Sequence, residues 1–208
     1  MHIGPEHDGM RMSLEDFARA EVEPGHSYEL EREVVVVSDL ADMPHGIVVF
    51  RMRMHVDVYA FTNPGTIQYV GGGSESALRM TEIESERHPD ISIYLTPQPV
   101  DDPQPWDCWT PDIVVEVVSK SSKKRDYDIK PAGYLEAGVR LYLILDPFTR
   151  AITVLTRHLN RWSKQTLTGS ATLTTRLLPG FAVKLADIFG PPAAGRSARP
   201  SRRPRGRR

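Results

Sequence analysis

The sequence predicts an α/β domain whose central sheet contains strands of mixed direction. Residues 112–119 and 140–147 are almost wholly apolar and rich in branched side chains, which is typical of strands covered on both faces. A helical pattern lies between them, so residues 112–146 are expected to form a strand–helix–parallel strand crossover. Short strand candidates separated by turns precede this unit. An antiparallel meander followed by one crossover gives a mixed sheet with flanking helices.

The first 40 residues contain three expected segments. Residues 1–11 are expected to form a loose leader. Ser13, followed three residues later by Asp16, is a weak capping box that favours a short helix. Residues 27–38, "SYELEREVVVVS", are rich in β-branched residues and are expected to form a strand that is partly buried on both faces.

A longer helix is expected over about residues 44–60. Val48, Met52, Val56 and Tyr59 recur at helical spacing, which indicates one buried face. Pro44 fits the first turn, where a missing N–H costs nothing. The β-branched content of the segment leaves a strand as the alternative.

The remaining elements follow in order along the chain. Short strands are expected within 66–70, 77–85 and 90–95, before a loop with five prolines at 96–111. After the apolar strand at 112–119, the polar, basic stretch 119–128 is expected to be a connection to a helix that ends near Gly138. Segments 151–156 and 160–168, beyond the second apolar strand, are expected to form a closing hairpin.

Charge is distributed unevenly along the chain. The net charge is −1, yet residues 196–208 hold seven arginines and no acid, so residues 1–195 carry −8. Residues 191–208 are too polar and proline-rich to build a core and are expected to be disordered. Such a tail either holds nucleic acid loosely through phosphates or is simply solvated.

Two features bear on where the protein works. The single cysteine, Cys108, cannot form an internal disulfide, which suits a reducing cytoplasm. No apolar run approaches the ~20 residues that a membrane helix needs, so no membrane span is expected. We therefore expect a cytoplasmic protein.

Glu116 is the most unusual residue of the predicted core. It lies in the middle of an apolar strand, and a buried carboxylate needs a cation or strong donors nearby. Asp112 faces the same side, but four residues along a strand span roughly 13 Å, too far to share one metal ion. Asp90 heads another apolar strand, and if the two strands are neighbours, Asp90 and Glu116 can share one Mg²⁺.

Lys130, on the helix that follows the Glu116 strand, is the expected source of positive charge. Such a lysine could contact a scissile phosphate or position the attacking water. The plain alternative is a buried ion pair between Glu116 and Lys130 without any catalytic role. Spacing by itself leaves the two interpretations about equally supported.

The segment "PDIVVEVVSKSS…RDYDIKPAGYLEAGVRLYLILDP" resembles a known protein family. It is similar to the restriction endonuclease family that was formerly a domain of unknown function and is abundant in cyanobacteria, within the PD-(D/E)xK nuclease superfamily. The likeness runs from about residue 12 to 190, and residues 111–147 are its specific part. The resemblance implies a restriction-endonuclease-like domain over residues 12–190.

The resemblance also implies a set of site residues. Asp90 and Glu116 match the two metal-binding acids, and Lys130 matches a catalytic lysine moved to the helix, because Val118 occupies the usual lysine position. Four further positions are expected to support this site, on the resemblance or on the face shared with Glu116: His45, Tyr134, Glu29 and Asp112.

The implied activity is Mg²⁺- or Mn²⁺-dependent hydrolysis of DNA phosphodiester bonds. The basic residues Lys120, Lys123, Lys124 and Arg125 could contact the DNA backbone, or form an ordinary solvated loop. A homodimer is expected, because many nucleases of this superfamily cut two strands with two sites. The alternative function is a catalytically inactive module on the same fold that binds nucleic acid or protein; the acidic body favours it mildly.

Overall fold

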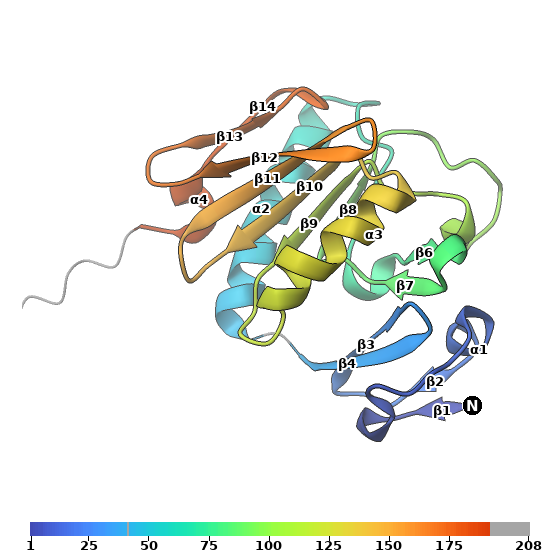
Figure 1. Cartoon of the computed structure of the whole chain (residues 1–208). Coiled ribbons are helices and arrows are strands. Elements are labelled where there is room, and N and C mark those ends of the chain that lie inside the picture. Colours follow the sequence, from blue (N-terminus) through green and yellow to red (C-terminus); the bar gives the residue numbers. More distant parts are fainter. Residues whose placement is uncertain (41, 192–208) are drawn as a thin grey trace, which may run out of the picture.

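A computed structural model describes residues 1–40 and 42–191, and a six-stranded sheet forms its centre (Figure 1). The strand order is β12-β11-β10-β9-β8-β5. Only β9 and β10 run parallel among these neighbours, and the other pairs are antiparallel. The strands are β5 (Tyr69–Gly71), β8 (Ile91–Tyr94), β9 (Ile113–Val117), β10 (Leu141–Asp146), β11 (Ala151–His158) and β12 (Arg161–Leu167). The predicted mixed sheet is confirmed.

Helices cover both faces of this sheet (Figure 1). Helix α2 (Met43–Thr62) packs Val48, Met52 and Val56 against the apolar residues that β8, β9 and β10 present to that side. Helix α3 (Lys130–Ala137) packs against the opposite set, because neighbouring side chains of a strand point to opposite faces. The helix predicted over 44–60 is therefore present, and Asp42 caps it by accepting a hydrogen bond from the His45 N–H.

The stretch 119–128, predicted as a polar connection, is partly helical instead. Helical structure begins at Lys123 and passes through a π-helical segment, η5 (Arg125–Ile129), into α3. In this segment the Lys130 N–H donates to the carbonyl of Arg125, five residues earlier. Pro131 has no N–H to continue the α-helical pattern, and a π-turn is a common way to accommodate such an interruption. Gly138, with φ of 97°, ends α3 as predicted.

A second sheet, in the order β4-β3-β7-β6, lies beside the first (Figure 1). Its strands are β3 (His26–Glu31), β4 (Val34–Asp39), β6 (Leu78–Met80) and β7 (Ser85–Arg87). The single strand predicted over 27–38 is wrong: it is a hairpin that turns at Arg32 and Glu33, whose φ angles are 49° and 65°. A two-residue turn of this kind normally contains Gly or Asn, so the sequence lacked the usual signal.

The prediction of a loose leader at residues 1–11 differs from the structure. Strand β1 (His2–Ile3) pairs with β2 (Glu21–Val22), and the Gly9 N–H donates to the Val35 carbonyl. Ile3 is fully buried in a small apolar cluster with Phe17 of α1 (Leu14–Ala18). One apolar side chain thus anchors a segment whose overall composition is polar. The predicted capping of α1 by Ser13 is confirmed.

The chain beyond the central sheet forms a hairpin and a short helix. These are β13 (Thr172–Thr175), β14 (Leu178–Lys184) and α4 (Leu185–Phe189). Short 3₁₀ turns complete the fold: η1 (Pro5–His7), η2 (Gly73–Glu75), η3 (Thr81–Ile83) and η4 (Pro105–Asp107). Of the tail predicted over 191–208, residues 192–208 lie outside the described residues. Among the helices described, none combines the length and apolar character of a membrane-spanning segment.

Candidate active site

Asp90 and Glu116 meet across neighbouring strands. Ile91 of β8 pairs with Val115 of β9, so the next step of the antiparallel register places Asp90 opposite Glu116. The Val117 N–H donates to Asp90 Oδ2 at 2.7 Å, which fixes the aspartate against β9. The strand pairing that the sequence analysis needed is therefore present.

Glu116 is 4% exposed and holds its two donors on one oxygen. Lys130 Nζ donates to Glu116 Oε1 at 2.7 Å, and the Tyr134 hydroxyl donates to the same oxygen. Both donors come from α3, one turn apart on one face of that helix. Burial raises the pKa of Glu116 to about 7, against the opposing charge of Lys130 and together with the like charge of Asp90.

Lys130 is surrounded by acids. Besides Glu116, its ammonium lies 3.5 Å from Glu29 Oε1 on β3 and 3.5 Å from Asp126 Oδ1, one turn earlier in the helix. Burial by itself lowers the pKa of Lys130, but the charges of Glu116, Glu29 and Asp126 outweigh it and raise that pKa. Lys130 is therefore a permanently charged ammonium held in a buried position.

His45 connects α2 to the same cluster. It lies in the first turn of the helix, and its Nε2 is 3.1 Å from Asp90 Oδ2. Burial lowers the pKa of His45, yet the hydrogen bond and charge of Asp90 raise it by more. His45 thereby orients Asp90.

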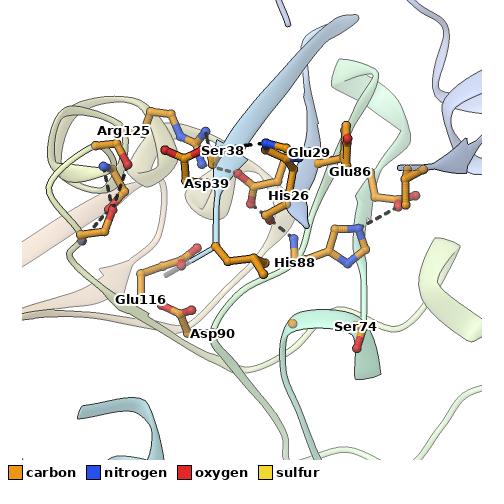
Figure 2. Close-up of a pocket in the computed structure, with 18 of the residues that line it drawn as sticks. His26, Glu29, Ser38, Asp39, Ser74, Glu86, His88, Asp90, Glu116 and Arg125 are labelled. Carbon is orange, nitrogen blue, oxygen red and sulfur yellow. Dashed lines mark hydrogen bonds and ion pairs between the residues drawn. The ribbon is translucent and has the colours of Figure 1, made fainter. Parts of the chain in front are cut away.

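A cavity of about 550 Å³ opens onto these side chains (Figure 2). One wall carries the charged groups of the central sheet and α3, including Asp90 and Glu116. The opposite wall comes from the N-terminal segment and includes Phe17, Val22 and Tyr28. The cavity is therefore charged around Asp90 and Glu116, whereas its lining from the N-terminal segment mixes apolar and polar residues.

Sequence reasoning missed Asp126, which is 1% exposed and lines this cavity. Its Oδ2 accepts a hydrogen bond from Ser122 at 2.5 Å, whereas its buried Oδ1 has no hydrogen-bond donor among the described residues. The spacing of Asp126, Lys130 and Tyr134 was the available signal, since steps of four place three residues on one helix face. The prediction of a loop over 119–128 concealed it.

A second omission is the pair Glu86 and His88 on the far side of the cavity (Figure 2). His88 Nε2 is 3.1 Å from Glu86 Oε1, and its Nδ1 is 3.1 Å from the carbonyl of Ser76. The pKa of His88 is lowered by burial and raised more strongly by Glu86, with a net rise. The position of His88 next to Pro89 and Asp90 was the available signal, but it favoured a surface histidine over one that hydrogen-bonds near the metal.

Two of the cavity's carboxylates leave oxygens available to a metal ion. Within the described chain, no protein group donates a hydrogen bond to Asp90 Oδ1 or Glu116 Oε2. Across those same residues, no group of three or more His, Cys, Asp or Glu converges as a preformed metal site. Two hard oxygen donors fit Mg²⁺, which usually keeps several waters and takes its other ligands from a bound phosphate.

Of the other predicted site residues, some line the cavity and others lie away from it. Glu29 lines the cavity, and Arg125 pairs with it at 2.5 Å. Asp112 does not belong to the cavity: it binds Arg140 and the Leu95 N–H at the other end of β9, because four residues of strand separate it from Glu116. Lys123 lies 3.6 Å from Asp146, and Lys120 and Lys124 are exposed.

Comparisons with known proteins agree with this architecture. A family model described as "Uma2: Putative restriction endonuclease" matches residues 14–186. The crystal structure of a "putative nuclease belonging to DUF820" from Anabaena variabilis ATCC 29413 superposes with a TM-score of 0.68 at 14% sequence identity. That alignment covers 86% of this chain and 97% of the other. No curated protein matches the sequence. At this identity the structural likeness establishes a shared fold and nothing beyond it.

Proposed function

The chain belongs to the Uma2 restriction endonuclease family, and from that premise we propose that it is a metal-dependent endonuclease that hydrolyses DNA phosphodiester bonds. One observation carries the proposal. Asp90 and Glu116 lie opposite each other at the wall of one cavity, with the Lys130 ammonium 2.7 Å from Glu116. Two acids and a cation at a shared cavity form the minimal set for this chemistry.

Asp90 Oδ1 and Glu116 Oε2 would hold the metal ion, Mg²⁺ or Mn²⁺. When bound, such an ion polarises the phosphate and lowers the pKa of a coordinated water. The raised pKa of Glu116 matters here, because its ionised form is the one that binds a cation. Metal binding is therefore expected to release a proton near neutral pH.

The chain's own residues hold the remaining charges in place. Lys130 supplies a fixed positive charge beside the acids, suited to stabilise the extra negative charge of a pentacoordinate phosphate. Tyr134 donates to Glu116 rather than contacting Lys130, so it orients the carboxylate. His45 does the same for Asp90.

The DNA backbone would approach from the side where helical structure begins. Lys120 and Lys124 are exposed there, whereas Lys123 and Arg125 are paired with acids. Contacts from two lysines release few counterions, so we expect weak binding with only a shallow salt dependence. We place this activity in the cytoplasm, where Cys108 stays reduced.

The test is plasmid nicking with and without Mg²⁺ or Mn²⁺. Wild-type protein should convert supercoiled DNA to relaxed or linear forms only with metal, and Glu116→Gln should abolish this. Glu136→Gln, a matched change on the exposed side of α3, should leave the rate unchanged. Calorimetric titration with Mn²⁺ supplies a second readout, since Asp90→Asn and Glu116→Gln should both weaken metal binding.

A second candidate is an inactive interaction module on the same fold. The observation that favours it is the neutralisation of Glu116 by Lys130 and Tyr134, which is what a purely structural buried ion pair requires. If the protein leaves all DNA substrates intact in the presence of Mg²⁺ or Mn²⁺ and binds no Mn²⁺, this candidate replaces the first.

A further inference from the structure

Helix α2 carries two apolar stripes, and the described part of the chain covers only one of them. The covered stripe consists of Val48, Met52, Val56 and Tyr59 and packs against the central sheet. The second stripe consists of six large apolar residues, here called the outer stripe: Met43, Ile47, Phe50, Met54, Val58 and Phe61. Their spacing of three and four residues places them on one helix face, opposite the covered stripe.

The outer stripe is open to solvent along the whole helix. Phe61 is 87% exposed, Met43 75% and Phe50 65%. The six exposed fractions correspond to an apolar surface on the order of 800 Å². Soluble monomers rarely expose a continuous patch of this size unless it serves an interaction. A standard protein–protein interface buries about 800 Å² on each partner, so the stripe is large enough for a stable contact.

We propose that the outer stripe is the interface of a homodimer in which two α2 helices pack antiparallel. The stripe is complementary to itself under a twofold axis at the level of residue 52. Phe50 then meets Met54 of the second copy, and Phe61 meets Met43 of the second copy. These two contacts, each made twice, join an aromatic ring to a methionine, a favourable pairing.

The flanking charges do not oppose this packing. Arg53 is bound to Glu75 at 2.5 Å, and Arg51 donates to the Ile188 carbonyl at 3.3 Å. Both guanidinium groups are thus engaged within their own chain. Residues 192–208 contain no large apolar residue that could cover the stripe in place of a second copy.

A membrane surface could also cover an apolar stripe of this kind, but the charges near the outer stripe disfavour it. Membrane-surface helices usually flank their apolar stripe with free Lys and Arg that bind anionic lipid. The two arginines beside this stripe are engaged, and residues 1–195 carry a net charge of −8. The observations therefore favour a second copy of the chain.

The dimer would hold the two cavities at a fixed spacing, a consequence that rests on the proposed function. His45 contacts Asp90 and lies seven residues from the axis, so two copies of His45 would lie roughly 20 Å apart along the helix direction. We expect dimeric protein to linearise plasmid and a monomeric variant only to nick it. If the linear product is lost and nicking is retained, the dimer has been broken and the endonuclease activity remains. If both products are lost, the proposed endonuclease activity itself has failed.

The test is the mass of the full chain in solution by light scattering and sedimentation. Wild type should have twice the mass of one chain at low micromolar concentration. Phe50→Glu should raise the dimer dissociation constant at least about 100-fold and leave the chain folded. Phe148→Glu, a matched change at another exposed phenylalanine (52% exposed), should remain dimeric.

Cross-linking tests the antiparallel arrangement in a Cys108→Ser background. A mixture of Phe50→Cys and Met54→Cys chains should form a disulfide-linked dimer, whereas Phe61→Cys alone should not. A monomeric wild type, or a dimer that Phe50→Glu leaves intact, would overturn the proposal. The proposal would also be overturned if the wild type is a monomer that floats with phosphatidylserine vesicles while Phe50→Glu does not float with them. Efficient cross-linking of Phe61→Cys would overturn the antiparallel geometry.

Discussion

The two ends of strand β9 each hold a buried acid, yet the surroundings of the two acids differ. Asp112 is 7% exposed and has one donor for each oxygen: the Leu95 N–H at 2.8 Å and Arg140 Nη1 at 2.9 Å. Glu116 is 4% exposed and has both donors on Oε1, while other acids crowd around it. A cavity borders Glu116 but not Asp112.

This comparison separates a structural acid from a candidate catalytic one. Both acids are buried and each pairs with one basic residue, so neither burial nor an ion pair marks a functional site. The distinguishing features at Glu116 are an oxygen left open toward a cavity and a pKa that burial, together with nearby like charges, raises. Substitutions at the two ends of β9 should therefore have different consequences.

The largest effect is expected at the basic partners of the two acids. Lys130→Met leaves Glu29, Glu116 and Asp126 without their shared cation and should lower the free energy of unfolding by about 3–5 kcal/mol at pH 8. Arg140→Met removes a half-exposed partner and should cost less than about 1 kcal/mol. Urea denaturation measures both values, and equal losses would remove the distinction between the two ends.

The next effect concerns activity. Glu116→Gln should reduce metal-dependent nicking by about 100-fold or more, because it removes a metal-binding oxygen's charge. Asp112→Asn should keep the wild-type rate per folded molecule, since its carboxylate lies outside the cavity. Initial rates of plasmid nicking decide this. A comparable loss in both variants would place Asp112 in the working site after all.

A pH effect should follow from the raised pKa of Glu116. Burial raises that pKa from 4.5 to about 7, so between these values the folded protein keeps a proton that the unfolded chain has lost. The contribution of Glu116 to stability therefore falls as pH rises from about 4.5 to 7, by on the order of 1–3 kcal/mol. Denaturation across this range should show a steeper decline for wild type than for Glu116→Gln. Parallel curves would argue against a raised pKa.

A smaller loss of stability than that of Lys130→Met is expected at the acid of the other strand end, Asp112. Asp112→Asn keeps the shape of the side chain but loses its charge, so the bonds to Leu95 and Arg140 weaken. We expect a loss of about 1–2 kcal/mol, seen as a lower melting temperature. A loss as large as that of Lys130→Met would show that this end of β9 is the more sensitive one.

The sequence determined the elements whose signals are local. Apolar runs indicated β9 and β10, helical spacing indicated α2, and Gly138 marked the end of α3. The hairpin at Arg32 and the ordered start of the chain were missed. The first lacks the usual turn residues, and the second depends on the burial of Ile3 by segments distant in sequence.

Residue types and the expected pairing of two strands predicted part of the candidate site, but not all of it. Asp90, Glu116, Lys130 and His45 were all expected, and the register of β8 and β9 brings the two acids together. The helix start at Lys123 and its π-turn, by contrast, place Asp126 beside Lys130, and neither was predicted. Tertiary structure also decided that Glu116 lines a cavity and Asp112 does not. The cavity forms where segments distant in sequence meet, and no local pattern along one strand predicts that.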